Sequence, residues 1–217
     1  MNRAVLWDLD GTLVDSAELH WFSWRDTLAA AGIDITYEQF LESFGQKNDR
    51  ILARWLGADA PAEQIRRIGD AKEAEYRRLA ELHGLTPQPG AAGWIHRLHE
   101  TGWKQAIASS APRQNVVVML RALRLDREPD AIVAAEDVTA GKPDPQVFLE
   151  AAAKLAVPAA RCVVVEDAAA GVEAARRAGM KCIGVTGGAP LDADLAVTSL
   201  IDLPADAFDR LLWAAAG

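Results

Sequence analysis

The chain has 217 residues, half of them hydrophobic, and a formal net charge of −8 at pH 7. No apolar run approaches the roughly 18–20 residues of a membrane span, and the acidic excess disfavours nucleic acid, whose phosphates require a basic face. We therefore expect neither a membrane nor a nucleic-acid partner.

The N-terminus shows no basic region that leads into a long apolar stretch, so no secretory signal is expected. The two cysteines, Cys162 and Cys182, both lie beside apolar, strand-like runs. Such thiols are typical of reduced, buried cysteines rather than of a disulfide. Together these features predict a cytoplasmic protein.

A strand is expected over the apolar run 4–10, and a long helical segment follows it. From about residue 16 to 84 every periodic stretch is helical, and one helix opens with a capping box formed by Thr36 and Gln39. A helical segment of this length predicts a separate lobe. We therefore expect two domains, an α/β core formed by 1–15 and 85–217 and a helical domain formed by 16–84.

Beyond residue 84, short apolar runs alternate with helical patterns. The runs span 104–110, 131–135, 162–167 and 182–187, and they are typical of buried strands in a parallel sheet. Gly102 and Gly179 are expected to end two of the helices, and a third should begin with Asp144 as N-cap and Pro145 at the first helical position. The alternation predicts an α/β fold with a doubly wound parallel sheet.

Polar side chains gather at the carboxyl ends of the predicted strands, which is where open α/β sheets bind their ligands. In chain order they are Asp8, Asp10, Ser109, Ser110, Lys142, Glu166 and Asp167. We expect four strand ends to meet at one edge of the sheet and to form a single site that contains acids, hydroxyls and one lysine.

Two acids at the end of an apolar strand require a reason. A calcium loop starting at Asp8 would need Gly at its sixth place and Glu at its twelfth, and these places hold Leu13 and Leu19. If the acids were plain turn residues, leaving them unpaired near a buried edge would be costly. A cation beside Asp8 and Asp10 removes that cost.

Asp167 or Glu166, brought alongside the pair, would complete the hard oxygen ligand set that Mg²⁺ prefers. Lys142 would then balance the charge of a bound phosphate. Ser109 and Ser110 precede the start of a helix, where backbone N–H groups and the helix dipole favour an anion. The residues thus predict Mg²⁺ as cofactor and a phosphorylated substrate.

Four short stretches of the chain resemble, in order, the four motifs of the haloacid dehalogenase superfamily. They are D-L-D-G-T from Asp8, the strand ending in Ser109, Lys142 in G-K-P-D-P, and the Glu166–Asp167 pair. The resemblance covers essentially the whole chain. The helical segment is similar to the cap of the branch that contains β-phosphoglucomutase and small sugar-phosphate phosphatases. Dehalogenases of the superfamily lack an acid at the position of Asp10, so phosphoryl transfer is expected here.

The resemblance implies a role for each matching acid. Asp8 would be the nucleophile that takes the phosphoryl group. Asp10 would act as general acid toward the leaving oxygen and then as general base. Asp8, the backbone carbonyl of Asp10 and Asp167 would hold Mg²⁺, with Glu166 in or just outside that shell.

The resemblance also implies substrate contacts. Ser109 and Lys142 would bind the phosphoryl oxygens. The further substrate-binding residues that we predict are His20, Gln46, Lys47, Asn48, Lys72 and Ser110. His20 and Lys72 match positions of the mutases, but each is equally compatible with an ordinary side chain on the surface of a helix.

One departure bears on the reaction. Mutases of this branch carry an arginine after the glycine of the cap loop, where this chain offers Lys47 and Asn48. Lysine does not replace a bidentate guanidinium, and Arg50 would reach only in a different register of the loop. Ala168, where serine is usual, should have a modest effect. We therefore expect a hydrolase of small phosphomonoesters, with sugar or polyol phosphates favoured, and a β-phosphoglucomutase-type mutase as the alternative.

A second class of function is also compatible with the sequence. The chain could be a phosphate-sensing protein that has the fold of the enzymes but no catalytic turnover. Receiver domains share a doubly wound sheet, an acid pair and a lysine, but they lack a helical insertion. Such a protein would undergo slow, stoichiometric phosphorylation of Asp8. The favoured partner remains a small phosphorylated metabolite, and the chain is expected to be a monomer or weak dimer.

Overall fold

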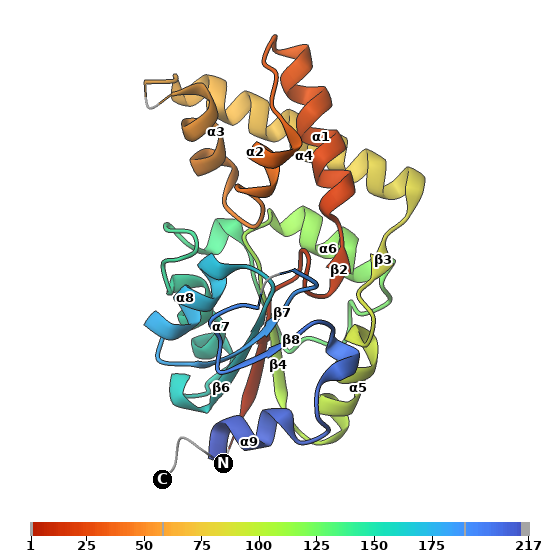
Figure 1. The fold of residues 1–217 in the computed structure, drawn as a ribbon, viewed down its shortest axis with the longest axis vertical. Helices are drawn as coiled ribbons and strands as arrows, with labels where there is room; N and C mark the ends of the chain where they lie inside the picture. The colour runs from red at the N-terminus through yellow and green to blue at the C-terminus, as the bar shows by residue number, and fades with distance from the viewer. Residues whose placement is uncertain (1, 58, 189, 214–217) are drawn as a thin grey trace.

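The structure is a computed structural model that describes residues 2–57, 59–188 and 190–213. Helices α1 to α4 lie together at one end of the molecule, above a sheet that the other helices flank (Figure 1). The helices are α1 (Ala17–Ala30), α2 (Tyr37–Leu41), α3 (Asn48–Leu56), α4 (Ala62–His83), α5 (Ala91–Glu100), α6 (Arg113–Ala122), α7 (Gln146–Leu155), α8 (Ala169–Arg177) and α9 (Ala207–Trp213).

The strands form two sheets. They are β1 (Ala4–Trp7), β2 (Val14–Asp15), β3 (Thr86–Pro87), β4 (Lys104–Ala108), β5 (Ala131–Val133), β6 (Cys162–Glu166), β7 (Lys181–Val185) and β8 (Leu195–Val197). Within the described residues the larger sheet has the order β5-β4-β1-β6-β7-β8, and all its neighbouring strands are parallel. The predicted fold class is confirmed.

Strand β1 lies at the centre of this sheet, and its side chains alternate between two cores. Val5 and Trp7 belong to a cluster with residues of α5, α6 and α9, whereas Ala4 and Leu6 belong to a cluster with residues of α7 and α8. A strand covered on both faces must be apolar at every position. This explains why the run Ala4–Trp7 is fully buried and shows no alternation in the sequence.

The register of the sheet brings the predicted site residues together. Trp7 pairs with Ile107 of β4 and with Val165 of β6, so the residues that follow these three positions leave the sheet at one edge. The predicted strand over 4–10 ends early, at Trp7. Beyond it the chain turns, and the Asp8 amide donates to the carbonyl of Val165 at 3.0 Å.

Strand β8 was absent from the sequence prediction. It is a three-residue edge strand that is only partly buried, so its sequence lacks the uniformly apolar run of a central strand. Three short 3₁₀ turns also occur in the described residues, η1 (Ala135–Asp137), η2 (Ala159–Arg161) and η3 (Leu200–Asp202).

Helices α1 to α4 pack around a cluster of their own, which includes Trp24, Phe40 and Leu52. The antiparallel pair β2–β3 joins this helical segment to the rest of the chain, because β2 precedes α1 and β3 follows α4 (Figure 1). The sequence prediction missed this pair, since two strands of two residues each carry no periodic signal.

Two helix starts test the capping predictions. Thr36 accepts from the Gln39 amide at 3.3 Å, and the Gln39 side chain accepts from the Thr36 amide at 2.8 Å, which confirms the capping box. Helix α7 instead begins one residue later than predicted, with Pro145 at the N-cap. The Asp144 carboxylate still caps it, because it accepts from the Gln146 amide at 3.0 Å.

Cys162 and Cys182 are both buried and unbonded, as predicted. Burial raises the pKa of the Cys162 thiol to about 11, so this cysteine stays protonated and unreactive at neutral pH. Among the helices that the structure describes, none combines the length and the apolar character of a membrane span.

Candidate active site

Three carboxylates from the ends of β1 and β6 form an acidic cluster. One oxygen from each of Asp8, Glu166 and Asp167 lies within 4.8 Å of the others. Burial raises the pKa of Asp167 to about 8, the neighbouring Glu166 adds to that rise, and Lys142 opposes it. Burial likewise raises the pKa of Asp8, against the attraction of Lys142.

This cluster fits a hard divalent cation. Its donors are carboxylate oxygens, which Mg²⁺ prefers, and burial, with a smaller contribution from the neighbouring acids, raises the pKa of Asp8 and of Asp167. The backbone also leaves room for the Asp167 carboxylate, because a Cβ on Gly11 would lie only 2.0 Å from one of its oxygens. Any other residue at position 11 would displace a member of the cluster.

Lys142 lies between two of these acids. Its ammonium donates to Asp8 Oδ1 and to Glu166 Oε1, each at 2.5 Å. Burial lowers the pKa of Lys142, but the two carboxylates outweigh burial and raise it above its ordinary value. The lysine is therefore charged, and it holds Asp8 at the edge of the sheet.

Glu166 is fixed by the start of α8. Its Oε2 accepts from the amides of Asp167 and Ala168, each at 3.0 Å. A Cβ on Gly171, in the first turn of α8, would lie 1.9 Å from the Glu166 carboxyl carbon. Only glycine permits this carboxylate to sit against the helix start, where the N–H groups and the dipole favour a negative charge.

Ser109 follows β4 and lies near the start of α6. Its hydroxyl accepts from the Ala111 amide at 3.0 Å, and its own amide donates to the Val133 carbonyl at 3.0 Å. The side chain is buried, whereas Ser110 is partly exposed and lines the cavity described below.

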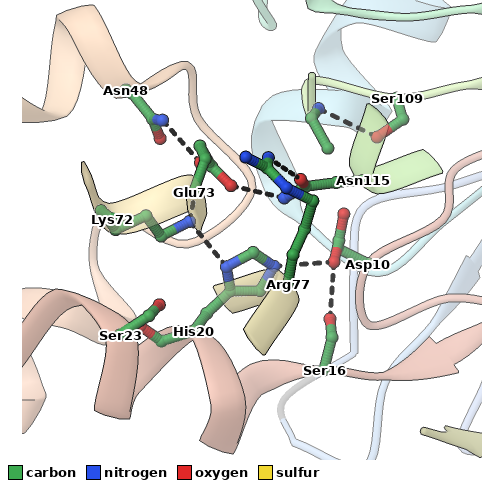
Figure 2. A network of polar contacts seen from close by, with 11 residues as sticks. Asp10, Ser16, His20, Ser23, Asn48, Lys72, Glu73, Arg77, Ser109 and Asn115 are labelled. Carbon is green, nitrogen blue, oxygen red and sulfur yellow. Dashed lines mark hydrogen bonds and ion pairs between the residues drawn. The ribbon is translucent and has the colours of Figure 1, made fainter. Parts of the chain in front are cut away.

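Asp10 belongs to a second network, separate from the acidic cluster (Figure 2). Its Oδ1 accepts from the Ser16 hydroxyl at 2.6 Å and lies 2.9 Å from His20 Nε2. Burial raises the pKa of Asp10, but His20, Ser16 and the nearby Lys72 charge outweigh burial and lower it below its usual value. The metal prediction for Asp10 concerned its backbone carbonyl, and its carboxylate points to this other network.

The tautomer of His20 follows from its two partners. Lys72 Nζ lies 2.8 Å from His20 Nδ1, and an ammonium can only donate, so Nδ1 is the acceptor. We assign the ring proton to Nε2, which then donates to Asp10. Burial and the Lys72 charge lower the pKa of His20, which agrees with a neutral ring.

Lys72 continues the network toward Glu73, whose Oε1 accepts from the ammonium at 2.8 Å. His20 and Lys72 are 7% and 2% exposed, so neither is a solvated side chain on a helix surface. Their predicted contact with substrate stays a prediction. What the structure adds is that both belong to the Asp10 network, with His20 on α1 between Asp10 and Lys72 on α4 (Figure 2).

Glu73 links the helical segment to the sheet domain. It accepts from the amide groups of Asn48, at 2.6 Å, and of Asn115 on α6. Arg77, one turn further along α4, donates to the Asn115 side-chain oxygen at 2.8 Å. The sequence analysis missed Glu73 and Asn115, because a contact between residues so far apart in the chain leaves no local signal.

The side-chain nitrogens of Lys47 and Gln46, in the loop before α3, donate to backbone carbonyls outside this network. Lys47 Nζ donates to the carbonyls of Ala135 and Val138, each at 3.1 Å. The Gln46 side-chain amide donates to the Glu42 carbonyl at 3.1 Å. The structure therefore brings Asn48 into the network but leaves the Lys47 ammonium outside it.

A cavity lies in front of Asp10, between the helical segment and the start of α6. Its polar lining comes from the networks just described and its apolar lining from α1, α2 and α3. The residues are Asp10, His20, Trp24, Phe40, Ser43, Phe44, Gly45, Gln46, Asn48, Ile51, Lys72, Glu73, Ser110, Ala111 and Pro112.

Residues 5–185 match the family of haloacid dehalogenase-like hydrolases. The chain is 34% identical over 220 residues to β-phosphoglucomutase of Bacillus subtilis, an alignment that covers 93% of this chain and 91% of that protein. It is 36% identical over 191 residues to the chloroplastic protein SUPPRESSOR OF QUENCHING 1 of Arabidopsis thaliana, but the match covers only 18% of that much longer protein. Two further relatives, each 30% identical, are named hexitol phosphatase B and validoxylamine A 7'-phosphate phosphatase.

A solved structure is also similar over the full length. The β-phosphoglucomutase of Clostridium difficile superimposes with a TM-score of 0.88 at 26% identity, covering 99% of this chain and 98% of that chain. The chain belongs to the haloacid dehalogenase-like hydrolase family. The predicted family and the predicted class of enzyme, one that acts on phosphate esters, are both confirmed.

Proposed function

We propose that the chain is a Mg²⁺-dependent phosphatase that hydrolyses small phosphomonoesters, with sugar or polyol phosphates as the favoured substrates. The observation that carries this proposal is the division of the two aspartates at the end of β1. Asp8 lies against Lys142 and the acidic cluster, whereas Asp10 lies against Ser16 and His20. This division supports Asp8 as the group that attacks phosphorus and Asp10 as the group that moves a proton.

In the first half-reaction, an Asp8 carboxylate oxygen forms a bond to phosphorus while the bond from phosphorus to the ester oxygen breaks. Asp10, protonated for this step, gives its proton to the departing alkoxide. In this proposal Lys142 and Ser109 bind the phosphoryl oxygens, on which negative charge accumulates in the transition state; the contact of Lys142 with Asp8 supports its role. The product is an aspartyl-phosphate on Asp8 and a free alcohol.

In the second half-reaction, water attacks the same phosphorus and Asp10, now a carboxylate, accepts the proton from that water. The bond between Asp8 and phosphorus breaks, which releases inorganic phosphate and restores both aspartates. Asp8, Glu166 and Asp167 would hold the Mg²⁺, with the Asp10 carbonyl as the further predicted ligand. The ion supplies positive charge that offsets the repulsion between a carboxylate and a phosphate dianion.

We propose further that 16–84 form a cap over the sheet edge and that 1–15 and 85–217 form the core. The β2–β3 pair at the crossing between the two segments supports this division. A cap over the cavity would exclude bulk water and contact the leaving group. The residues that we propose for this contact are His20, Gln46, Lys47, Asn48 and Lys72, together with Ser110.

Two buried, unbonded cysteines support a reducing compartment such as the cytoplasm. We still expect the chain to be a monomer or a weak dimer.

A β-phosphoglucomutase is the second candidate, and the 34% identity to the Bacillus subtilis enzyme favours it. A mutase must hold a second phosphate while its intermediate turns over. This chain offers Lys47 and Asn48 around the position where the mutases carry an arginine, and Arg50 donates to the Lys142 carbonyl at 3.2 Å instead of pointing into the cavity. These contacts favour the hydrolase.

The test is phosphate release with and without Mg²⁺ across a panel of hexose, pentose and polyol monophosphates. β-Glucose 1-phosphate is also assayed for glucose 6-phosphate. Multiple turnovers of free phosphate from a few compact substrates support the phosphatase. Glucose 6-phosphate formed without phosphate release would show a mutase, and a single turnover that stops at phosphorylated Asp8 would show a phosphate-sensing protein.

A further inference from the structure

The charge of the cavity in front of Asp10 is unusual for a site that handles phosphate esters. Among the described residues that line it, Lys72 is the one side chain with a positive charge, since His20 is neutral. Glu73 contributes a negative charge that offsets Lys72, and Asp10 adds no positive charge in either protonation state. The part of the cavity that lies away from the acidic cluster therefore carries no net positive charge.

Glu73 is built into this cavity as an ionised group. It is 6% exposed, and its oxygens accept from Lys72, Asn48 and Asn115. Burial raises the pKa of Glu73, but Lys72 and the donated hydrogen bonds outweigh burial and lower it. Because Glu73 neutralises the charge of Lys72, the ammonium is not available to a second anion.

The other cations near the cavity are held on different partners. Lys47 donates to two carbonyls of the segment after β5, and Arg50 donates to the carbonyl of Lys142. Arg77 is bound to Asn115. None of these three lines the cavity as the structure describes it.

The remaining lining suits a neutral, hydroxylated group. Asn48, Ser110 and the Glu73 carboxylate offer hydrogen-bonding atoms that sugar hydroxyls can use, and Trp24, Phe40 and Phe44 offer apolar walls. A second phosphate would bring a dianion into the same space without a free cation to receive it. Close approach of like charges in a poorly solvated site is strongly unfavourable.

We propose that Glu73 is a specificity-determining residue whose negative charge excludes a second phosphate, so that the enzyme takes monophosphates of neutral polyols or sugars and rejects bisphosphates. This inference rests on the proposed phosphatase function and names the substrate class within it. It also gives a reason why this chain should not act as a mutase, which must accommodate a bisphosphate intermediate.

The test compares D-mannitol 1-phosphate with D-mannitol 1,6-bisphosphate. Mannitol has a twofold axis, so both phosphates of the bisphosphate are equivalent to the phosphate of the monophosphate. The two substrates then differ only at the distal end of the leaving group. We expect kcat/KM per reacting phosphate to be at least ten-fold higher for the monophosphate, measured as initial rates of Mg²⁺-dependent phosphate release.

The variant Glu73→Gln removes the charge and keeps the shape. We expect it to reduce the ratio of the two kcat/KM values at least five-fold, whatever it does to overall activity, because a general loss cancels in the ratio. Glu73→Asp keeps the charge and should retain the wild-type preference. Glu75→Gln is the matched control on α4, since Glu75 pairs with Arg78 and does not line the cavity.

A further substrate distinguishes a failure of the proposed role of Glu73 from a failure of the proposed phosphatase function. Phosphate release from p-nitrophenyl phosphate reports on the phosphoryl site whatever the leaving group is. If neither this ester nor any sugar phosphate is hydrolysed, the proposed function fails and the inference fails with it. If p-nitrophenyl phosphate is hydrolysed and wild type shows equal kcat/KM for the two mannitol phosphates, the inference alone is overturned, even if Glu73→Gln does not fold. A wild-type preference that Glu73→Gln leaves unchanged also overturns it.

Discussion

Two aspartates that are neighbours on one strand end have opposite environments. Asp8 is buried among acids and its pKa is raised, whereas Asp10 accepts hydrogen bonds from Ser16 and His20 and its pKa is lowered. Titratable groups whose surroundings push their pKa values apart are a mark of divided chemical roles. Burial and the neighbouring acids raise the pKa of Asp8 despite the charge of Lys142, whereas His20 and Ser16 lower the pKa of Asp10.

Asp8→Asn tests the nucleophile. The amide has nearly the same shape but no anionic oxygen to attack phosphorus, so turnover should fall to background for every phosphomonoester. Thermal unfolding and circular dichroism should show an intact fold. Activity close to wild type in a folded Asp8→Asn protein would overturn the assignment.

Asp10→Asn tests the proton donor. A sugar or polyol alkoxide is a poor leaving group, and losing its general acid should cost about 10²- to 10⁴-fold in kcat/KM. An aryl phosphate scarcely needs the proton, so p-nitrophenyl phosphate should lose much less in the first half-reaction. Rapid-quench measurement of the initial burst isolates that step. Equal losses of the burst rate for both esters would count against Asp10 as the acid.

At the scale of elements, helix α4 connects the Asp10 network to the core. Lys72 and Glu73 lie on its buried side, and Glu73 and Arg77 together bind Asn115 of α6. Asn115 is fully buried. A single core side chain thus satisfies two charged residues of the helical segment, which holds α4 and α6 in one relative position.

Asn115→Ala should therefore destabilise the protein by about 2 kcal/mol, because it removes one buried hydrogen bond from Glu73 and one from Arg77. Urea unfolding followed by fluorescence measures the change. The matched control is Arg66→Ala, which removes an exposed ion pair of the same helix and should have little effect. If both variants unfold at the same urea concentration as wild type, the contact contributes nothing to stability.

At the scale of the whole molecule, the acidic cluster would couple the proposed metal binding to pH. Without a cation, the folded protein binds protons more tightly at Asp167, with a pKa of about 8, than the unfolded chain does, with a pKa of about 3.8. A raised pKa in the folded state means that stability falls as pH rises between these two values. A divalent cation bound to the ionised carboxylates would reverse this loss.

We therefore expect added Mg²⁺ to raise the midpoint temperature of unfolding more at pH 8 than at pH 5.5. Differential scanning fluorimetry with EDTA, with Mg²⁺ and with Ca²⁺ measures this directly. In Asp167→Asn the shift should be largely lost at both pH values. A Mg²⁺ shift of the same size at both pH values in wild type would contradict the proposed ligand set.

The sequence alone determined the fold class and predicted which polar residues meet at the edge of the sheet. Buried parallel strands read as uninterrupted apolar runs, and the residues that follow them must meet at one edge of the sheet. For this reason the sequence by itself predicts that Asp8, Lys142 and Asp167 lie close together, as they do in the structure. The sequence did not predict strand β8 or the pair β2–β3, because short, partly exposed strands show little hydrophobic pattern.

Only the tertiary structure decided what surrounds Asp10. His20 and Lys72 could equally have been solvated helix residues, and nothing in the sequence indicated that Glu73 and Asn115 meet. Such contacts depend on the angle at which α4 crosses the core. They also depend on burial, because a lower dielectric constant strengthens the electrostatic interaction within each ion pair. Local periodicity encodes which residues face inward, but it does not encode which inward-facing residues become neighbours across two segments of the chain.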